Sequence, residues 1–263
     1  EEEYCPPLNS RMAAEDETTP VVAEDEEDEL TLAVPEVCTK YREAAKIANL
    51  ALQGTITMCV ADASIVNICK FGDEVINRSV ANIFRAKKAG KAMDKGVAFP
   101  TCISVNEVVC HFCPLESETA IPALKDGDIV KIDLGVHIDG FIAVVGHTLK
   151  VGTAPSPESP ASDDYGNLMR AAHVCSEVAT NLIKPGNTNQ QVTQAWAKVA
   201  ESFHCSLVQG TLSHQMKRYV IDGNKVVLLR EEVDQKVEDQ TFMENEVYGI
   251  DIALSSGDGK AKE

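Results

Sequence analysis

The chain has 263 residues, 44% of them hydrophobic, so it is long and apolar enough to bury a substantial core. Its formal net charge is −17 at pH 7, and this charge is unevenly placed, because residues 1–30 hold twelve acidic residues and one basic residue. No apolar run approaches the roughly eighteen residues of a membrane span, and the start is too acidic for a secretory signal, so membrane insertion is not expected.

Residues 1–36 are predicted to be an acidic disordered tail. The acidic run at residues 24–29 repels itself and has little apolar surface to bury. Met12 opens the segment Met-Ala-Ala-Glu-Asp, which resembles a natural translation start. Residues 1–11 are therefore treated as non-native and left out of the fold. The remaining chain, residues 37–263, is predicted to form one folded domain.

Hydrophobic periodicity in the next part of the chain predicts two amphipathic helices, over residues 39–53 and 73–88. The second of these is expected to stop at Gly90, which follows a basic last turn. Residues 97–100 and 103–111 are then expected to be extended.

The later part of the chain begins with a loop rich in proline and serine at residues 153–162. A helix is predicted from Asp163 or Asp164 up to Lys184, a second helix over residues 189–203, and a strand over residues 248–254. Two helices and a hairpin, followed by two helices and a strand, predict an α+β fold with two facing halves.

The hairpin is predicted over residues 128–134 and 141–151, because Asp139-Gly140 between them is a turn signal. If residues 138 and 141 flank the turn, Asp133 lies opposite Gly146 and diagonal to Val144 on one face. A two-metal hydrolase needs a carboxylate at both strand positions, since bridging oxygens must clamp the two cations. Val144 has no lone pair to donate, so this hairpin has the frame of a metal site without all of its ligands.

The nine cysteines are odd in number and lie scattered in apolar contexts. This pattern favours reduced thiols of the cytosol or nucleus, most of them acting as small buried hydrophobic residues. Cys110-His111-Phe112-Cys113 has CxxC spacing, but no second pair lies at the spacing of a zinc finger. Neither a zinc site nor a redox motif is favoured there.

Four stretches in this order resemble the creatinase/methionine aminopeptidase family, whose pita-bread fold has a curved antiparallel sheet covered by helices. They begin at Ala98-Phe99-Pro100, Lys131-Ile132-Asp133, Leu212-Ser213-His214 and Glu246-Val247-Tyr248. The amino-acid sequence of these stretches is most similar to that of a subgroup of proliferation-associated, ErbB-receptor-binding proteins that lack peptidase activity. The resemblance covers residues 37–263, and it implies an aminopeptidase-like domain that is incomplete at the C-terminus.

The resemblance implies remnant metal-ligand positions at Asp133, His214 and Asp251. The second chelating aspartate of the active enzymes falls on Val144 and is lost, and Asp251 stands for a longer glutamate. Without two metals no bridging hydroxide forms, so catalysis should fail.

Two further positions belong to the remnant pocket that the resemblance implies. A substrate-side histidine falls on His111 and is kept, whereas a second one falls on Asp222 and is lost.

The resemblance thus implies a catalytically inactive protein with no cofactor that regulates growth, ribosome biogenesis and translation. Its implied partners are RNA, ribosomes and pre-ribosomes, regulatory proteins and, in the remnant pocket, peptide N-termini. Its implied location is the cytoplasm, nucleus and nucleolus. The alternative is a divalent-metal-dependent methionine aminopeptidase with an altered ligand set.

One stretch of the chain is densely basic and supplies the candidate RNA-binding residues Arg85, Lys87, Lys88 and Lys91. Several of these cations could face one phosphate track together. The alternative is a solvated helix end, because few aromatic residues interleave with the charges.

Overall fold

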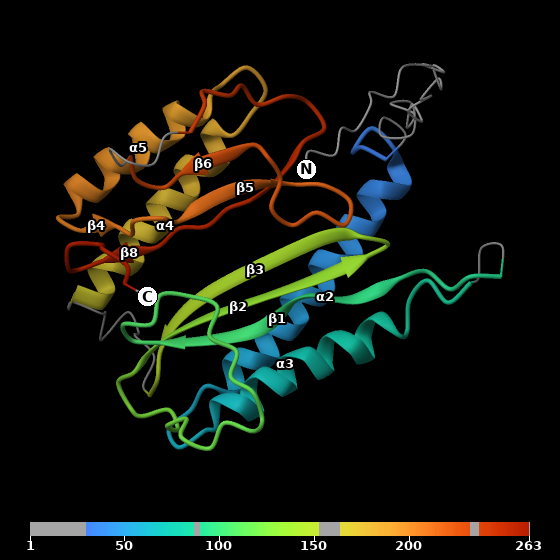
Figure 1. Cartoon of the computed structure of the whole chain (residues 1–263), viewed down its shortest axis with the longest axis horizontal. Helices are drawn as coiled ribbons and strands as arrows, with labels where there is room; N and C mark the ends of the chain where they lie inside the picture. Colours follow the sequence, from blue (N-terminus) through green and yellow to red (C-terminus); the bar gives the residue numbers. More distant parts are fainter. Residues whose placement is uncertain (1–29, 87–89, 153–163, 232–236, 263) are drawn as a thin grey trace, which may run out of the picture.

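The computed structural model describes residues 30–86, 90–152, 164–231 and 237–262. Its first half contains helices α2 (Pro35–Met58) and α3 (Ile65–Val80) and strands β1 (Lys95–Val105), β2 (Ile129–Ile138) and β3 (Phe141–Lys150). The strands form an antiparallel sheet in the order β1-β2-β3, with α2 and α3 packed against it (Figure 1). Helix α2 begins at Pro35, two residues inside the segment predicted to be the tail; residues 1–29 lie outside the described residues.

The predicted bounds of α3 are wrong at both ends. The helix begins at Ile65, because the Ser64 side chain caps it by accepting a hydrogen bond from the backbone N–H of Asn67. It ends at Val80 rather than near residue 88. Phe84 adopts a left-handed conformation with φ 46°, and the Lys95 ammonium binds the backbone carbonyl of Ile83. A tertiary contact therefore ends the helical region before the glycine stop signal.

The hairpin prediction is confirmed in its register. Asp133 pairs with Gly146, Gly135 with Val144 and Ile138 with Phe141. The two turn residues, Asp139 and Gly140, both have positive φ, 55° and 79°, as a type I′ turn requires. Strands with a right-handed twist favour this turn, so local sequence was sufficient to set the register.

The second half contains helices α4 (Asp164–Leu182) and α5 (Asn189–Ser202) and five short strands. Strands β5 (Leu212–Met216), β6 (Val226–Leu228) and β7 (Val247–Gly249) form a sheet in the order β6-β5-β7. Strands β4 (Ser206–Leu207) and β8 (Leu254–Ser255) form a separate antiparallel pair.

The single strand predicted over residues 248–254 is wrong, since it is two strands with different partners. Gly249 in β7 pairs with His214 in β5, whereas Leu254 in β8 pairs with Leu207 in β4. Between them the backbone N–H of Asp251 donates to the side-chain hydroxyl of Ser213 in β5 at 2.9 Å, and not to a backbone carbonyl of that strand. The chain therefore changes partners at Asp251.

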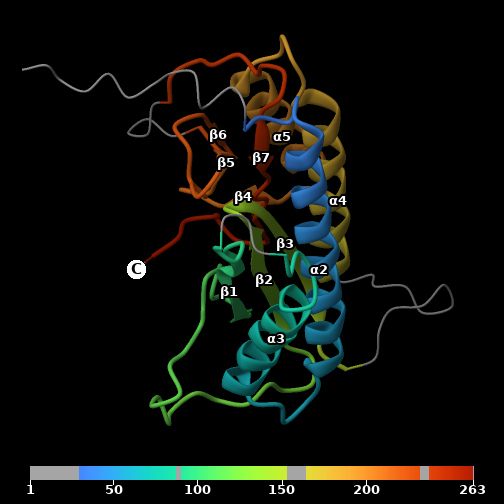
Figure 2. The same cartoon turned by 90° about the vertical axis from the view of Figure 1, so that its right-hand side faces the viewer.

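Each half has its own hydrophobic core, one between α2, α3 and the β1-β2-β3 sheet and the other around Trp196 of α5. Helices α2, α3 and α4 lie on one side of the strands (Figure 2). Among the described residues, no helix is long and apolar enough to cross a bilayer. This α+β arrangement in two halves is the one expected from the sequence.

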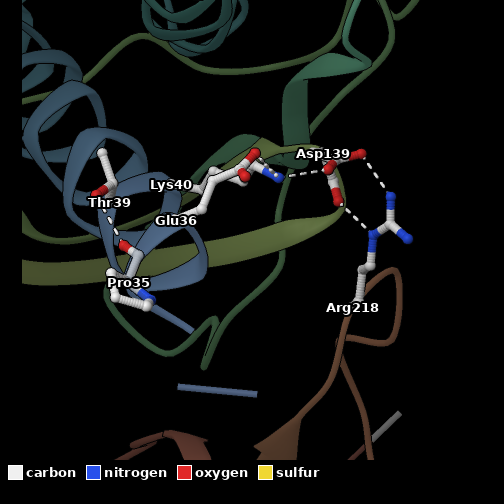
Figure 3. Close-up of polar contacts among 6 residues, drawn as sticks. All are labelled: Pro35, Glu36, Thr39, Lys40, Asp139 and Arg218. Carbon is white, nitrogen blue, oxygen red and sulfur yellow. Dashed lines mark hydrogen bonds and ion pairs between the residues drawn. The ribbon is translucent and has the colours of Figure 1, made fainter. Parts of the chain in front are cut away.

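The halves are joined at the tip of the β2–β3 hairpin (Figure 3). The Asp139 carboxylate accepts hydrogen bonds from Lys40 of α2 at 2.8 Å and from Arg218 of the second half at 2.6 Å. Arg218 also donates to the Asp139 carbonyl at 2.9 Å, and Tyr219 N–H donates to the Gly140 carbonyl at 2.8 Å. These bonds, which we call the Asp139 clamp, hold the segment that follows β5 against the tip of the β2–β3 hairpin.

Candidate functional site: a remnant metal pocket

The remnant pocket lies where β2, β5 and the segment after β7 meet. The His214 Nε2 atom lies 3.3 Å from the Asp251 carboxylate and 3.5 Å from the Asp222 carboxylate. The imidazole rests on Gly249, its partner across the strands, where a Cβ would come within 3.0 Å of the ring. Glycine is therefore required beneath the ring, and β5 and β7 together aim His214 at the two acidic residues.

The electrostatics of the pocket favour a charged histidine. The hydrogen bond with Asp251 raises the pKa of His214, burial opposes this, and the charges of Asp251 and Asp222 add to the increase. The Nε2 nitrogen of His214 therefore already faces two carboxylates.

Asp133 points into the same region from β2. Burial raises its pKa most, the negative charge of Asp251 raises it further, and His111 and Lys131 act in the opposite direction. Asp251 is therefore the common neighbour of Asp133, through its charge, and of His214, through a hydrogen bond. His111 lies at its edge, in a left-handed conformation with φ 62°.

Val144 lies on the same face of the hairpin as Asp133 and pairs with Gly135. A Cβ added at Gly135 would come within 3.3 Å of a Val144 methyl and 2.9 Å of the Phe99 Cβ. The Phe99 ring packs edge-on against His111, with centroids 5.1 Å apart. Where a dinuclear site needs a chelating carboxylate, this pocket therefore has an aliphatic side chain.

These residues do not fit a dinuclear metal centre. Within residues 30–86, 90–152, 164–231 and 237–262, no three or more His, Cys, Asp and Glu side chains are placed to hold a metal ion. A hard divalent ion needs several oxygen or imidazole ligands converging within about 2.0–2.6 Å. Val144 supplies no ligand atom, and the His214 Nε2 atom faces the carboxylates of Asp222 and Asp251.

The candidate RNA-binding residues fall only partly within the described chain. Arg85 and Lys91 are exposed, whereas Lys87 and Lys88 lie outside the described residues. The Arg85 guanidinium donates to the Asn82 side chain at 2.5 Å. Arg85 and Lys91 follow the end of α3 at Val80 rather than forming its last turn.

The Asp139 clamp was not predicted, because in the sequence Asp139 is recognisable only as a turn residue. Lys40 is the signal that could have pointed to it, since it is a lysine on the apolar face of α2 whose side chain is only 7% exposed. A buried ammonium requires a partner, but the sequence does not say which carboxylate reaches it.

Comparison with known proteins places these features in a family. The model of metallopeptidase family M24 matches residues 39–257. The chain is 49% identical over 239 residues to "ERBB-3 binding protein 1" of Solanum tuberosum, covering 91% of this chain and 59% of that protein. It is 44% identical over 247 residues to "Proliferation-associated protein A" of Dictyostelium discoideum, covering 94% of this chain and 61% of that protein.

A third curated relative, "Curved DNA-binding protein" of Schizosaccharomyces pombe, is 42% identical over 236 residues, covering 88% of this chain and 60% of that protein. Among solved structures, that of a thermophilic Arx1 matches with a TM-score of 0.74 and 25% identity, covering 86% of this chain and 65% of that one. The chain thus spans about three fifths of the length of the curated relatives it matches.

Proposed function

Because the chain belongs to metallopeptidase family M24, with the pita-bread fold of that family, we propose that it is a catalytically inactive member that acts as a binding regulator. The observation that carries this proposal is the aliphatic Val144 side chain, which pairs with Gly135 across the hairpin at the position of a chelating carboxylate. No bridging hydroxide can be generated without a second metal-binding carboxylate, so the peptide bond lacks its nucleophile.

Metal content and peptidase activity test this proposal together. After exchange with cobalt, manganese or zinc, the purified protein should hold well under two ions per chain and release no N-terminal methionine. Val144→Asp alone should not restore activity, because Asp251 is short and His214 Nε2 is already paired. Two tightly bound ions with methionine release would instead establish the alternative, a metal-dependent aminopeptidase with an altered ligand set.

The pocket supports capture of a peptide N-terminus without cleavage. The carboxylates of Asp222 and Asp251 lie beside His214, and that of Asp133 senses the charge of Asp251, so the region is suited to an α-ammonium group. The apolar wall formed by Phe99 and Val144 could accept the first side chain. A peptide beginning with Met should bind more tightly than the same peptide with an acetylated N-terminus, and equal affinities would exclude this role.

The second part of the proposal is regulation of growth, ribosome biogenesis and translation through protein and RNA partners in the cytoplasm and nucleolus. Two relatives are named for binding partners, one for ErbB-3 and one for curved DNA. The exposed cations Arg85 and Lys91, together with Lys87 and Lys88, are the candidate contacts for phosphates. Ribosomes and pre-ribosomes are the polyanionic partners that the resemblance favours.

Salt dependence separates a phosphate-binding surface from a solvated loop. Reversal of Lys87, Lys88 and Lys91 to glutamate should weaken RNA or ribosome binding strongly at low salt and leave folding intact. Each lost phosphate contact should flatten the slope of log affinity against log salt by about one unit. Reversal of Lys184, Lys198 and Lys260, on other elements, is the matched control. If both triple variants bind like the parent, the connection before β1 contributes no contact.

A further inference from the structure

Three cysteine side chains from distant parts of the chain meet behind the remnant pocket. Cys69 lies on α3, Cys102 lies on β1, and Cys113 lies in the loop that follows β1. The Cys113 sulfur interacts with both of the other thiols through side-chain hydrogen bonds. We call Cys69, Cys102 and Cys113 the thiol cluster.

The close approach of α3 to β1 explains how Cys69 reaches this position. A Cβ at Gly72 would come within 2.3 Å of the Thr101 hydroxyl, so only glycine permits the contact. One residue further along α3, the Asp73 carboxylate accepts hydrogen bonds from the Thr101 N–H and hydroxyl, both at 2.8 Å. Cys69 lies one helical turn before Asp73, and at this position its thiol interacts with those of Cys113 and Cys102.

The backbone places Cys102 and Cys113 opposite each other. Ile103 N–H donates to the Phe112 carbonyl at 2.8 Å, and Phe112 N–H donates to the Ser104 hydroxyl at 3.2 Å. If Ile103 lies opposite Phe112 on antiparallel segments, then Cys102 lies opposite Cys113. Directly opposed residues in such segments have Cα atoms about 4.5–5.5 Å apart, within the span of a disulfide.

The three thiols differ in their access to solvent. Cys69 is 4% exposed and Cys102 is 1% exposed, whereas Cys113 is exposed. An exposed thiol in contact with a buried one matches the arrangement of an attacking and a resolving cysteine. Cys110, the other cysteine of the CxxC motif, lies near the charges of Asp133 and Asp251 of the remnant pocket; it also acts electrostatically on Cys102, but no hydrogen bond joins it to Cys113.

We propose that Cys113 and Cys102 form a reversible disulfide that fastens the loop carrying His111 to β1. The remnant pocket would then respond to the thiol–disulfide redox potential around the protein. The Cys113 thiolate attacks one sulfur of a low-molecular-weight disulfide, forming a mixed disulfide and releasing one thiol, which takes up the proton of Cys113. The Cys102 thiol then loses its proton, attacks the Cys113 sulfur and releases the second small thiol. Two protein thiols and one small disulfide thus become one protein disulfide and two small thiols.

The pocket would respond because Cys102 is the strand partner of Asp133, and His111 lies two residues before Cys113. A covalent link from Cys113 to β1 would restrict the loop beside Asp133 and fix the contact of His111 with Phe99. In the reduced form no covalent cross-link joins the loop to β1, and the contacts between them are noncovalent, among them the Ile103–Phe112 backbone hydrogen bond, the bond from Phe112 N–H to the Ser104 hydroxyl, and the contact of His111 with Phe99.

The chemistry of the cluster makes this response slow. Burial raises the pKa of Cys113 above that of an ordinary thiol, and the hydrogen bonds from Cys69 and Cys102 only partly oppose it. Burial also raises the pKa of Cys102 to about 12. Since the thiolate is the attacking species, the rate should rise about tenfold for each pH unit between 7 and 8. The thiol cluster is therefore suited to respond to a lasting oxidising redox potential rather than to a brief exposure to an oxidant.

Incubation of the purified chain with mixtures of reduced and oxidised glutathione tests this proposal. Alkylation, proteolysis and mass spectrometry should find Cys102 joined to Cys113, and reduction should reverse the link. Hydrogen exchange in residues 106–114 should slow on oxidation. Cys113→Ser should abolish the link and this slowing, and the substitution lies at an exposed position, so folding should persist. Cys110→Ser is the matched control and should behave like the parent.

Several outcomes would overturn the proposal. A Cys113 that remains free, or that stops at a glutathione adduct, would show that Cys102 cannot resolve it. A link from Cys113 to Cys110 or to Cys69 would overturn the assignment of Cys102 as partner. Unchanged hydrogen exchange after complete formation of the Cys102–Cys113 link would show that the disulfide does not control the loop. None of these results depends on whether the remnant pocket binds peptides or metals.

Discussion

The Asp139 clamp should be a principal stabilising link between the two halves, and Asp139→Asn tests this directly. Asparagine keeps the size of the side chain and tolerates the left-handed conformation of φ 55° at this position. It retains an acceptor oxygen but removes the charge that faces Lys40 and Arg218. The perturbation is therefore electrostatic, with little change in turn geometry.

The expected loss follows from the exposure of the partners. The Lys40 side chain is only 7% exposed and the Arg218 side chain is 34% exposed, so the first ion pair is poorly screened and the second is partly screened. Breaking a buried pair costs about 3–5 kcal/mol and a hydrogen bond to a charged group about 1.5–3 kcal/mol. Because Glu36 stays 3.1 Å from Lys40, we expect a loss of about 2 kcal/mol in the free energy of unfolding.

Urea unfolding followed by circular dichroism measures this loss as a lower midpoint concentration. Thermal unfolding should show a melting temperature lower by about 4–8 °C. Glu36→Gln is the matched control, because Glu36 binds the same lysine but its side chain is 61% exposed, so its loss should cost well under about 1 kcal/mol. Equal losses in both variants would refute the claim that Asp139 is the partner on which Lys40 depends.

The pH dependence of the clamp supplies a second test. Partial burial raises the pKa of Asp139, but the hydrogen bonds from Lys40 and Arg218 outweigh it, so the folded-state pKa is lowered. A lowered folded-state pKa contributes stability that is present above the unfolded value of about 3.9 and is lost as the pH falls through the folded value. The difference between the parent and Asp139→Asn should therefore be constant near pH 7 and should shrink below about pH 4. A difference that grew on acidification would contradict this assignment.

Three further predictions concern packing and the tail. Gly72→Ala should lower the free energy of unfolding by about 1–3 kcal/mol in denaturant titrations, since its Cβ would meet the Thr101 hydroxyl at 2.3 Å. Trp196→Phe should cost about 2 kcal/mol by the same measurement, because the indole N–H that donates to the Cys175 carbonyl at 2.9 Å is lost from a fully buried position. Deletion of residues 1–29 should leave the melting temperature nearly unchanged in calorimetry, since a strongly acidic segment has little apolar surface to bury; a drop of several degrees would mean that it packs on the domain.

Features that depend on neighbours in the chain were predictable from the sequence. The β2–β3 hairpin follows from Asp139-Gly140 and from the two-residue alternation of its strands, so the pairing of Asp133 with Gly146 was correct. The helices of the second half were also located within a few residues, because α5 has a capping box at Thr188 and Gln191.

The tertiary structure decided where distant segments stop and meet. α3 stops at Val80, before its glycine signal, and the apolar run after Val247 divides into two strands because Asp251 bonds to Ser213. The remnant pocket and the thiol cluster likewise depend on contacts that the sequence alone does not reveal. The sequence showed that Val144 lacks a ligand atom, but the ion pairing of His214 and the meeting of Cys113 with Cys102 depend on contacts between remote residues. Such contacts are set by the packing of whole elements, which no local pattern of residues encodes.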